Sequence, residues 1–398
     1  MTIPDRPEGK IKLSVFHNLP SGGGNNAAGT MIRGISNRFS LTMHFPKGSS
    51  AISVPESVHS REWPFNYSGR ISGIRRLAAP FVLPARLKAL DQLCRRIAEE
   101  INRSSDLTLV YNSMYIAAPP LLKYLKIPSI YFCYEYPRHL YEPTLVKRTR
   151  GGIHHFLLGY LRKLERKMDM TAALSADNVV TLSNWMKKRL YYIYGIDSSV
   201  VRPGIDTEFF RADETVDKKR LVLSIGALWP FKGHEMAIET ISRIKLEKRP
   251  SLVIVADREF PGYGAELERS AAKLGVDLSV RRGISNEKLR TLYSTAKAVL
   301  CCQHNEPYGL VPLEAMSCGI PVVAVKEGGF IDNLRNGENG LLVKRDSAEM
   351  AGALDRILAD NHLREKLITG GREFVIRERS ASEAASRLHK ILIDALKK

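Results

Sequence analysis

Short apolar runs alternate with longer amphipathic stretches along most of the chain, and this alternation is the strongest constraint on its fold. The runs have the length of buried strands, while the stretches between them carry apolar residues at helical spacing. Strand and helix in regular alternation predict parallel α/β sheets. The expected strands are 11–16, 107–110, 129–132, 178–181, 220–225, 251–256, 278–281, 298–301 and 321–325. The expected helices include 85–103, 234–246, 265–274, 286–294 and 312–317.

The alternation falls into two sets, which predicts two doubly wound, Rossmann-like domains in this chain of 398 residues. Pro203-Gly204 makes a turn signal between the sets, so we expect the first domain over 1–203 and the second over 204–381. The C-terminal helix, within 382–398, can pack on either domain, including back on the first. Ligands of such sheets bind outside the carboxyl ends of the strands, so the two domains are expected to face each other across a cleft.

The formal net charge is +18 at pH 7, and most of it belongs to the first half. Residues 1–204 hold 29 Lys+Arg and 14 Asp+Glu, a net charge of +15. Such an excess favours an anionic partner, such as a lipid surface, a phosphorylated acceptor or nucleic acid, although charge also serves solubility. No nucleic-acid recognition motif accompanies the charge, so we expect no nucleic-acid partner.

Two basic segments, 68–90 and 144–168, interleave arginine and lysine with large apolar residues. Such segments can lie on an anionic leaflet with the apolar side chains inserted. This reading predicts a peripheral protein on the inner face of the cytoplasmic membrane. In the alternative reading, the apolar residues face the core and the charges are solvated.

The sequence indicates a cytoplasmic compartment. No run reaches the roughly 18 unbroken apolar residues that span a bilayer, and residues 1–12 lack the apolar region of a secretory signal. The five cysteines are scattered without framework spacing, which indicates reduced thiols. No zinc-ligand spacing and no DxD motif stands out, so neither a metal nor a cofactor is expected.

The most informative stretch is 305–343. Glu306 precedes a turn that ends at Gly309, a helix that carries Glu314 follows, and Gly319 ends it. A helix N-terminus offers free N–H groups and a partial positive charge, which suit a phosphate. Carboxylates before the turn and inside the helix can accept hydrogen bonds from sugar or ribose hydroxyls. The pattern therefore predicts a nucleotide-sugar site.

This stretch resembles glycosyltransferase family 4, whose members have the GT-B fold and retain anomeric configuration. The resemblance rests on two glutamates with seven residues between them, in a context like EPFGLVPLEAMACGxPVVA. It implies that Glu306 contacts the donor sugar and that Glu314 contacts the ribose. The donor-binding residues implied in this stretch are Glu306, Tyr308, Gly309, Leu310, Val311 and Glu314, of which the backbone at 309–311 holds the distal phosphate.

A second match is 224–237, where the family pattern is GRLxxxKG. Lys232 stands at the lysine position, beside a helix N-terminus, and suits a diphosphate. The arginine position is Ala227, so one phosphate contact is missing or comes from elsewhere; Arg258 and Arg282 are alternatives. Residues 179–206 match a third family segment, in which Ser183 and the Pro203-Gly204 turn are mainly structural.

The glycine run 22–24 follows the first expected strand, and a helix is expected to open near Ala27. Glycines allow close backbone approach to a ligand, and the resemblance places Gly23 and Gly24 near the donor diphosphate and the acceptor. The run alone could also be a flexible turn.

The segment 131–138 departs from the family pattern YYCHEPPR, because Tyr134 replaces the histidine. The family histidine lies near the anomeric carbon of the sugar. Tyrosine, with an ordinary pKa near 10, is a poor general base at pH 7 but can donate a hydrogen bond. Glu135 and Arg138 match the pattern and are candidates for the acceptor side.

The function predicted from the resemblance is retaining, metal-independent hexosyl transfer from a UDP- or GDP-sugar. The acceptor is a glycan or a polyprenyl- or other lipid-linked molecule in cell-surface polysaccharide or glycolipid synthesis. The catalytic candidates are Lys232, Glu306 and Tyr134. The alternatives are an inactive donor-binding scaffold, which Ala227 and Tyr134 motivate, and another GT-B enzyme such as a phosphorylase or an epimerase.

Overall fold

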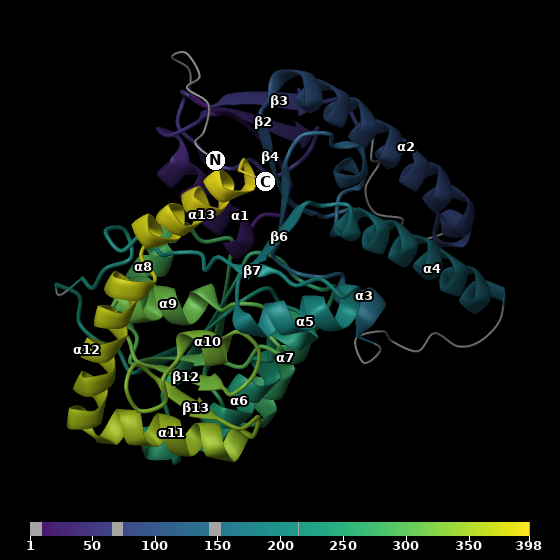
Figure 1. The fold of residues 1–398 in the computed structure, drawn as a ribbon. Coiled ribbons are helices and arrows are strands. Elements are labelled where there is room, and N and C mark those ends of the chain that lie inside the picture. Colours follow the sequence, from purple (N-terminus) through teal and green to yellow (C-terminus); the bar gives the residue numbers. More distant parts are fainter. Residues whose placement is uncertain (1–9, 66–74, 143–152, 214, 398) are drawn as a thin grey trace. The chain divides into compact units, whose positions relative to one another are not determined.

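The computed structural model describes residues 10–65, 75–142, 153–213 and 215–397 (Figure 1). The chain forms two compact units. The first contains Met1–Leu182, Met186–Val201 and Ala385–Lys398, and the second contains Ser183–Trp185 and Arg202–Ala384. Parts of the basic segments 68–90 and 144–168 lie outside the described residues.

The first unit contains a seven-stranded sheet in which every neighbouring pair is parallel. The strand order is β3-β2-β1-β4-β5-β6-β7. The strands are β1 Lys12–Asn18, β2 Ser40–Pro46, β3 His59–Trp63, β4 Leu107–Ser113, β5 Ser129–Cys133, β6 Asn178–Thr181 and β7 Ser199–Val200. All residues of β4 and β5 are buried, because helices cover both faces of the sheet.

The helices of the first unit pack on the sheet in two sets. The α-helices are α1 Gly23–Ile35, α2 Arg75–Ser104, α3 Arg138–Tyr141, α4 Ile153–Leu174, α5 Asn184–Tyr194 and α13 Ala381–Ala395, and η1 Pro120–Tyr124 is a 3-10 helix. Helices α2 and α4 contact each other and η1. Helix α13 contacts α1, where Ala385 lies against Gly34. The described tail of the chain, from Ala385 on, therefore belongs to the first unit.

The second unit contains a six-stranded, wholly parallel sheet with the order β10-β9-β8-β11-β12-β13. The strands are β8 Leu221–Ile225, β9 Ser251–Ala256, β10 Leu278–Arg282, β11 Ala298–Cys301, β12 Val322–Val325 and β13 Leu341–Val343. The sequence order reverses between β8 and β11, so the loops after these two strands lie side by side at the carboxyl edge. Ligands of doubly wound sheets bind at such a point.

Helices cover both faces of the second sheet. The α-helices are α6 His234–Ser242, α7 Tyr263–Lys273, α8 Asn286–Thr295, α9 Leu310–Ser317, α10 Phe330–Asn333, α11 Ser347–Ala359 and α12 Asn361–Glu378; η3 Pro230–Lys232 and η4 Leu246–Lys248 are 3-10 helices. On one face α6 packs with α7 and α11, and on the other α9 packs with α10 and α12.

The predicted parallel sheets are confirmed, and each expected strand overlaps a strand of the structure. The sequence analysis missed β2, β3, β7 and β13. Four of the five residues of β3 are exposed, so this edge strand has no apolar run to reveal it. Helix α1 begins at Gly23, four residues before the predicted Ala27. Gly23 and Gly24 therefore lie in the first turn of a helix and not in a loop.

Among the described residues, no helix has the length and apolarity to cross a bilayer. All five cysteines are buried and free.

Candidate functional site

A tight turn leads into α9 at the carboxyl edge of the second sheet. Gly309, which precedes α9, has a φ of 89°, and an added Cβ would lie 2.7 Å from the Phe330 ring. Both the backbone and the available space thus require glycine. No side chain in the described part of the chain caps α9. Its first N–H groups, at Leu310 and Val311, can therefore bind an anion.

Lys232 and Glu306, predicted from separate motifs, form an ion pair in which Nζ lies 2.8 Å from Oε2. The two side chains are 22% and 21% exposed, so solvent screens the pair only in part. Gly233 follows Lys232 with a φ of 70°, and an added Cβ there would lie 2.2 Å from the carbonyl oxygen of Cys302. This close approach joins the loops after β8 and β11. The structure thus brings Lys232 and Glu306 together near the start of α9.

Glu314 lies on α9, and the Tyr293 hydroxyl donates to its carboxylate at 2.8 Å. Burial raises the pKa of Glu314, and the hydrogen bond from Tyr293 opposes this rise. A carboxylate has about four acceptor positions, so this one can still accept a ligand hydroxyl. The geometry is compatible with the predicted contact to a ribose.

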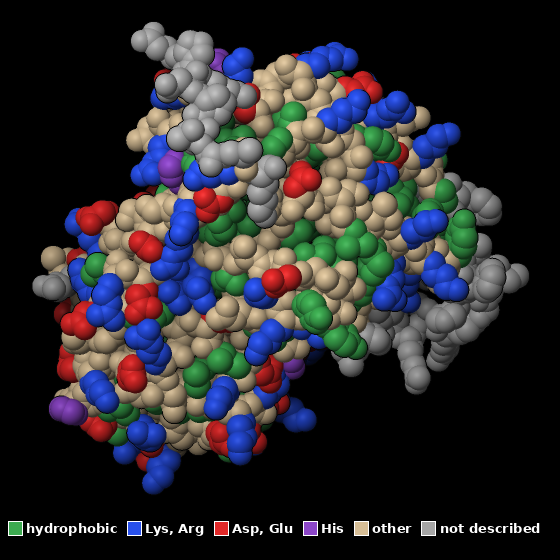
Figure 2. Space-filling model, in the orientation of Figure 1, with side chains coloured by type: hydrophobic (Ala, Val, Ile, Leu, Met, Phe, Trp, Pro, Cys, Tyr) green, Lys and Arg blue, Asp and Glu red, His purple; other side chains and the backbone are tan. Residues whose placement is uncertain are grey.

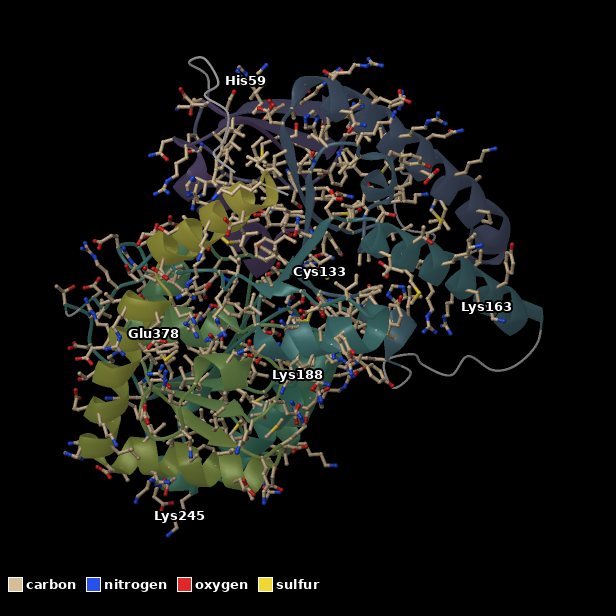
Figure 3. All side chains as sticks on the ribbon, viewed as in Figure 1. His59, Cys133, Lys163, Lys188, Lys245 and Glu378 are labelled. Carbon is tan, nitrogen blue, oxygen red and sulfur yellow. The ribbon has the colours of Figure 1, made fainter. Side chains whose placement is uncertain are left out.

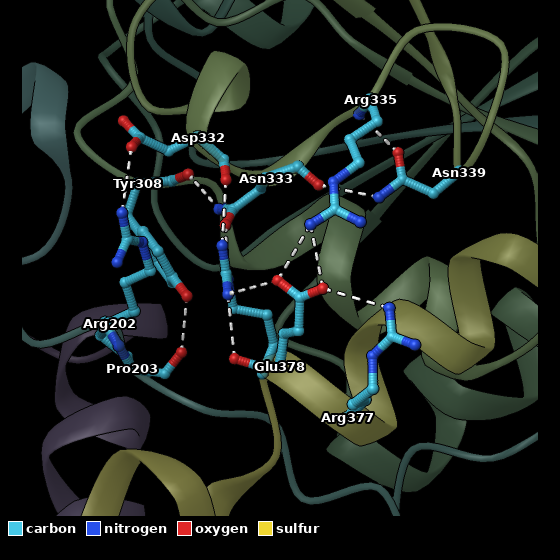
Figure 4. A network of polar contacts seen from close by, with 10 residues as sticks. Arg202, Pro203, Tyr308, Asp332, Asn333, Arg335, Asn339, Arg377 and Glu378 are labelled. Atoms are coloured by element: carbon cyan, nitrogen blue, oxygen red, sulfur yellow. Dashed lines mark hydrogen bonds and ion pairs between the residues drawn. The ribbon is translucent and has the colours of Figure 1, made fainter. Parts of the chain in front are cut away.

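A buried polar network fixes the position of Tyr308 (Figure 4). Its side chain is buried, and its hydroxyl donates to the Pro203 carbonyl oxygen at 2.7 Å. Asn333 Nδ2 donates to the Tyr308 carbonyl oxygen at 2.8 Å, and Arg379 Nε donates to Asn333 Oδ1 at 3.0 Å. Ser183 Oγ donates to the Pro307 carbonyl oxygen at 2.6 Å. The Tyr308 side chain therefore anchors the turn, and a contact of Tyr308 with the donor stays a prediction.

Arg345, which the sequence analysis missed, ties the loop before Glu306 to the loop after β12. Its guanidinium donates two hydrogen bonds to the Glu327 carboxylate, at 2.8 and 2.7 Å. It also donates to the carbonyl oxygens of Cys302 and Gln303, at 2.8 and 2.9 Å. Four hydrogen bonds from one fork-shaped group fix both loops in relation to each other.

The loop at Ala227 is shaped by His234, another residue that the sequence analysis did not single out. The His234 Nε2 atom lies 3.2 Å from the carbonyl oxygens of both Gly226 and Ala227, and Nδ1 lies 2.9 Å from Ser224 Oγ. Burial lowers the pKa of His234 to about 4, although the hydrogen bonds to Ala227 and Gly226 act to raise it. The ring is therefore neutral at pH 7 and supplies no charge where the family carries an arginine.

The two arginines considered as substitutes are each in an ion pair. Arg258 Nε lies 3.3 Å from Asp257, and Arg282 Nε lies 3.0 Å from Glu259. Both arginines are about half exposed, at 50% and 47%. A role for either in binding phosphate stays a prediction.

In the first unit, the start of α1 lies against Tyr134. Gly22 has a φ of 121°, and its carbonyl oxygen accepts from Asn26 N at 3.1 Å. A Cβ added at Gly24 would lie 3.3 Å from the Tyr134 ring, so this glycine allows the close approach. The structure thus brings together Gly24 and Tyr134, which the sequence analysis placed in separate motifs.

Tyr134 itself belongs to a buried aromatic cluster. Its ring meets those of Tyr111 and Phe132 edge-on, with centroids 5.3 and 4.9 Å away. Asn112 Oδ1 accepts from Tyr134 N at 2.5 Å, and Asn112 Nδ2 donates to the Glu135 carbonyl oxygen at 2.8 Å. Asn112, on β4, therefore fixes the loop after β5, a role that no local sequence signal indicates.

The two acceptor-side candidates differ in exposure. Arg138 is 9% exposed and donates to Glu142 Oε2 from two nitrogens, at 2.9 and 3.2 Å. Burial acts to raise the pKa of Glu142, but hydrogen bonds from Arg138 and Tyr136 outweigh it and lower the pKa. Glu135 is 48% exposed, with its carboxylate 4.0 Å from the Arg138 guanidinium. Glu135 is thus the more accessible of the two.

Residues 206–374, which hold Lys232, Glu306 and Glu314, match the family model described as Glycosyl transferases group 1. This part of the chain is therefore similar in sequence to the group 1 glycosyltransferases. The D-inositol 3-phosphate glycosyltransferase of Acidothermus cellulolyticus is 32% identical over 234 residues, which cover 52% of this chain and 51% of that protein. The enzyme of the same name from Geodermatophilus obscurus is 33% identical over 218 residues, covering 49% and 48%. The chain thus spans about half the length of the curated relatives it matches.

Beyond residues 206–374, solved structures show a likeness of fold that covers almost the whole chain. Sucrose-phosphate synthase from Thermosynechococcus elongatus superposes with a TM-score of 0.76 at 17% identity, covering 98% of this chain and 100% of that one. Anabaena HepE, solved in complex with UDP and glucose, gives a TM-score of 0.73 at 15% identity, covering 96% and 99%. The predicted GT-B fold and the family 4 resemblance are both confirmed.

Proposed function

We propose that the chain is a glycosyltransferase that moves a hexosyl group from a nucleotide sugar to a glycan or lipid-linked acceptor. The observation that carries this proposal is the Lys232–Glu306 ion pair near the uncapped start of α9, with Glu314 on the same helix. A cation, free N–H groups and two carboxylates suit the phosphates and hydroxyls of one nucleotide sugar.

The ion pair leaves capacity for a ligand. An ammonium has three donors, so Lys232 can keep Glu306 and still reach a phosphate oxygen. Glu306 has acceptor positions left for the sugar hydroxyls, and Glu314 for those of the ribose. The N–H groups of Leu310 and Val311 can donate to a phosphate at the positive end of α9. These groups can stabilise a leaving diphosphate without a metal or a cofactor, which is why the proposal requires neither.

The proposed transfer retains the anomeric configuration. The bond from the anomeric carbon to the diphosphate oxygen breaks, and the bond to the acceptor oxygen forms on the same face of the sugar. The acceptor hydroxyl passes its proton to the leaving diphosphate. Lys232 and the start of α9 oppose the negative charge that the diphosphate gains. Tyr134 serves as a hydrogen-bond donor and not as a base.

The acceptor is proposed to bind the first unit. Support comes from the positions of Gly24 and Tyr134, which lie together, and from Glu135, which is exposed. The charge of +15 on residues 1–204 supports an anionic or lipid-linked acceptor at the inner face of the cytoplasmic membrane. Cell-surface polysaccharide or glycolipid synthesis would use such a reaction. HepE was solved with UDP, so a UDP-sugar is the first donor to test, followed by a GDP-sugar.

Ala227 favours a second candidate function. Without the family arginine, the loop after β8 offers Lys232 as the cation of this motif, and Lys232 is paired with Glu306. A protein that binds the donor without turnover, and serves as a scaffold for other enzymes, would tolerate this loss.

Calorimetric titration with UDP, GDP and ADP and with their sugar conjugates tests the proposal. We expect saturable binding of one nucleotide family and at least ten-fold weaker binding in Glu314→Ala, because the carboxylate proposed to bind the ribose is removed. Glu365→Ala, which removes an exposed carboxylate from α12, is the matched control and should bind as the unmodified protein does. No binding of any nucleotide would contradict the proposal. Binding without turnover over a broad acceptor panel would favour the scaffold.

A further inference from the structure

Two aromatic side chains stand exposed on neighbouring loops of the second unit. Trp229 follows β8 and is 39% exposed; Phe260 follows β9 and is 37% exposed. Their ring centroids are 5.5 Å apart, with the ring planes at 61°. Phe231 lies beside Trp229, with the two ring centroids 5.9 Å apart. We name Trp229, Phe231 and Phe260 the aromatic platform.

The backbone beneath the aromatic platform is ordered by strand-like pairing. Leu228 is fully buried, and its N–H donates to the Arg258 carbonyl oxygen at 2.8 Å. Phe260 N donates back to the Leu228 carbonyl oxygen, also at 2.8 Å. The pairing fixes the backbone positions from which the two rings project, which lowers the cost of ordering the loops when a ligand stacks on the rings.

The surroundings of the aromatic platform are polar and carry no net charge. Lys232 and Arg258 supply two positive charges, and Asp257 and Glu259 supply two negative ones. An anionic membrane or a nucleic acid would require a basic excess, which is absent from these loops. A protein partner would require a much broader apolar area than two rings. A saccharide ring binds through an aromatic face that contacts its C–H groups and through polar groups that contact its hydroxyls. The aromatic platform and its neighbours supply both.

The position ties the aromatic platform to the candidate site. Trp229 lies three residues before Lys232, whose Nζ is 2.8 Å from Glu306 and 5.5 Å from the centre of the Phe231 ring. A saccharide stacked on Trp229 would therefore lie at the same edge of the sheet as the proposed donor site.

We propose that the aromatic platform binds a saccharide unit of the acceptor, so that the acceptor is a glycan. This inference rests on the proposed function and goes beyond it, because it assigns a glycan contact to the second unit and names the class of acceptor. Trp229 supplies the stacking face, Phe260 buttresses it, and Arg258 and Asp257 hydrogen-bond the hydroxyls.

The test compares binding of the full-length chain and its variants to a glycan microarray, in the presence of UDP and GDP. We expect Trp229→Ala and Phe260→Ala to lose at least ten-fold in signal on the glycans that the unmodified chain binds. Trp229→Phe should keep most of the signal, because it preserves an aromatic face. The matched control is Leu246→Ala. Leu246 is 75% exposed and follows Lys245, in the connection from α6 to β9 at the opposite edge of the sheet (Figure 3).

The outcomes separate this inference from the proposed function. Nucleotide affinity, measured by calorimetry, should be the same within two-fold in the unmodified chain and in Trp229→Ala. Equal glycan signals in Trp229→Ala and the unmodified chain, or no glycan signal at all, would overturn the inference even if nucleotide binds. Loss in Trp229→Ala of binding to phosphatidylglycerol vesicles, without any glycan signal, would overturn it in favour of a membrane contact. If no nucleotide binds but glycans bind through Trp229, the glycan site stands and the proposed function fails.

Discussion

Three histidines are buried in the neutral state, one of them beside the candidate site. Burial lowers the pKa of His17, His44 and His234 to about 4 in each case, and Arg61 adds to the shift of His44. In the unfolded chain each has a pKa near 6.5. The folded pKa is the lower one, so each histidine contributes stability that is fully present above pH 6.5. That stability is lost as the pH falls from 6.5 towards 4.

Asp169 changes the stability of the fold with pH in the opposite direction. Burial raises its pKa to about 6, although hydrogen bonds from Tyr194 and Tyr141 and from the Ala118 N–H act to lower it. Its folded pKa is the higher one, so its contribution favours the fold at low pH and fades as the pH rises from 3.8 towards 6. Of these four groups, the histidines alone therefore lower the free energy of unfolding as the pH falls from 7.5 to 6. Below pH 6 the protonation of Asp169 offsets part of that loss.

We predict that acidification from pH 7.5 to 5 lowers the urea midpoint of unfolding. Each histidine contributes up to about 1.4 kcal/mol per pH unit within its window. His234→Gln should make the urea midpoint less dependent on pH, by about the contribution of one of the three histidines. His362→Gln, on the exposed start of α12, is the control and should leave the dependence unchanged. A midpoint that rises on acidification would contradict the assignment of neutral buried rings.

At the scale of elements, the candidate site depends on how the loops after β8, β11 and β12 hold one another. Gly328 follows Glu327, and an added Cβ there would lie 2.5 Å from the Glu306 carbonyl oxygen. Gly329 N donates to the same oxygen at 2.6 Å. Glu306 is therefore supported from the loop after β12, and Arg345 fixes that loop by binding Glu327.

We predict that Arg345→Ala weakens nucleotide binding at least ten-fold, because Arg345 positions the loop that carries Glu306. The loop that carries Glu306 would lose two hydrogen bonds, and the loop after β12 would lose two at the Glu327 carboxylate. Arg345→Lys should restore part of the affinity through a single ion pair to Glu327. Calorimetric titration with the nucleotide that the unmodified chain binds measures both effects.

The control for Arg345 is another arginine with a carboxylate partner. Arg335 donates to both oxygens of Glu378 at 2.9 and 3.1 Å (Figure 4). Arg335→Ala should change thermal stability but leave nucleotide affinity within two-fold. If Arg345→Ala and Arg335→Ala behave alike, Arg345 has no specific role in positioning Glu306.

The elements that sequence patterns predict are those whose signal is local. Apolar runs locate the buried strands, whereas β3 is exposed at four of five positions and gives no such signal. The start of α9 can be predicted because the turn at Gly309 and the two glutamates lie within one short stretch of sequence. The residues that hold the site are polar groups from distant parts of the chain, such as Asn112, Asn333 and Arg345. Their partners lie on other elements, so their contacts exist only after the chain has folded.

At the scale of the whole molecule, the basic excess lies in residues 1–204. This part of the chain includes two helices with exposed tyrosines. On α4, Tyr160 is 60% exposed near the exposed Lys163 and Lys167. On α5, Tyr191 and Tyr192 are 66% and 82% exposed. Figure 3 shows Lys163 on α4 and Lys188 on α5, and Figure 2 shows Lys and Arg side chains along the course of α2. Tyrosine with basic neighbours is typical of side chains at a membrane–water interface.

We predict that the protein co-sediments with phosphatidylglycerol vesicles and not with phosphatidylcholine vesicles, and that salt weakens the binding. Reversing Arg162, Lys163 and Lys167 to glutamate should weaken it at least ten-fold, because each basic residue near the surface contributes about 1 kcal/mol. The control reverses three exposed lysines of the second unit, Lys273, Lys288 and Lys366. An equal loss in both triple variants would mean that net charge, and not this surface, governs the binding.

The core of the first unit is completed by residues that follow the whole second unit in the sequence. Leu388 and Leu392 of α13 are fully buried, and Ala385 packs against Gly34 of α1. During synthesis, these residues leave the ribosome only after every residue of the second unit has been made. Synthesis of the first unit therefore begins before that of the second unit and ends after it. Until then the face of α1 that Ala385 later covers is open to solvent, and a nascent chain in this state is a natural client for a chaperone.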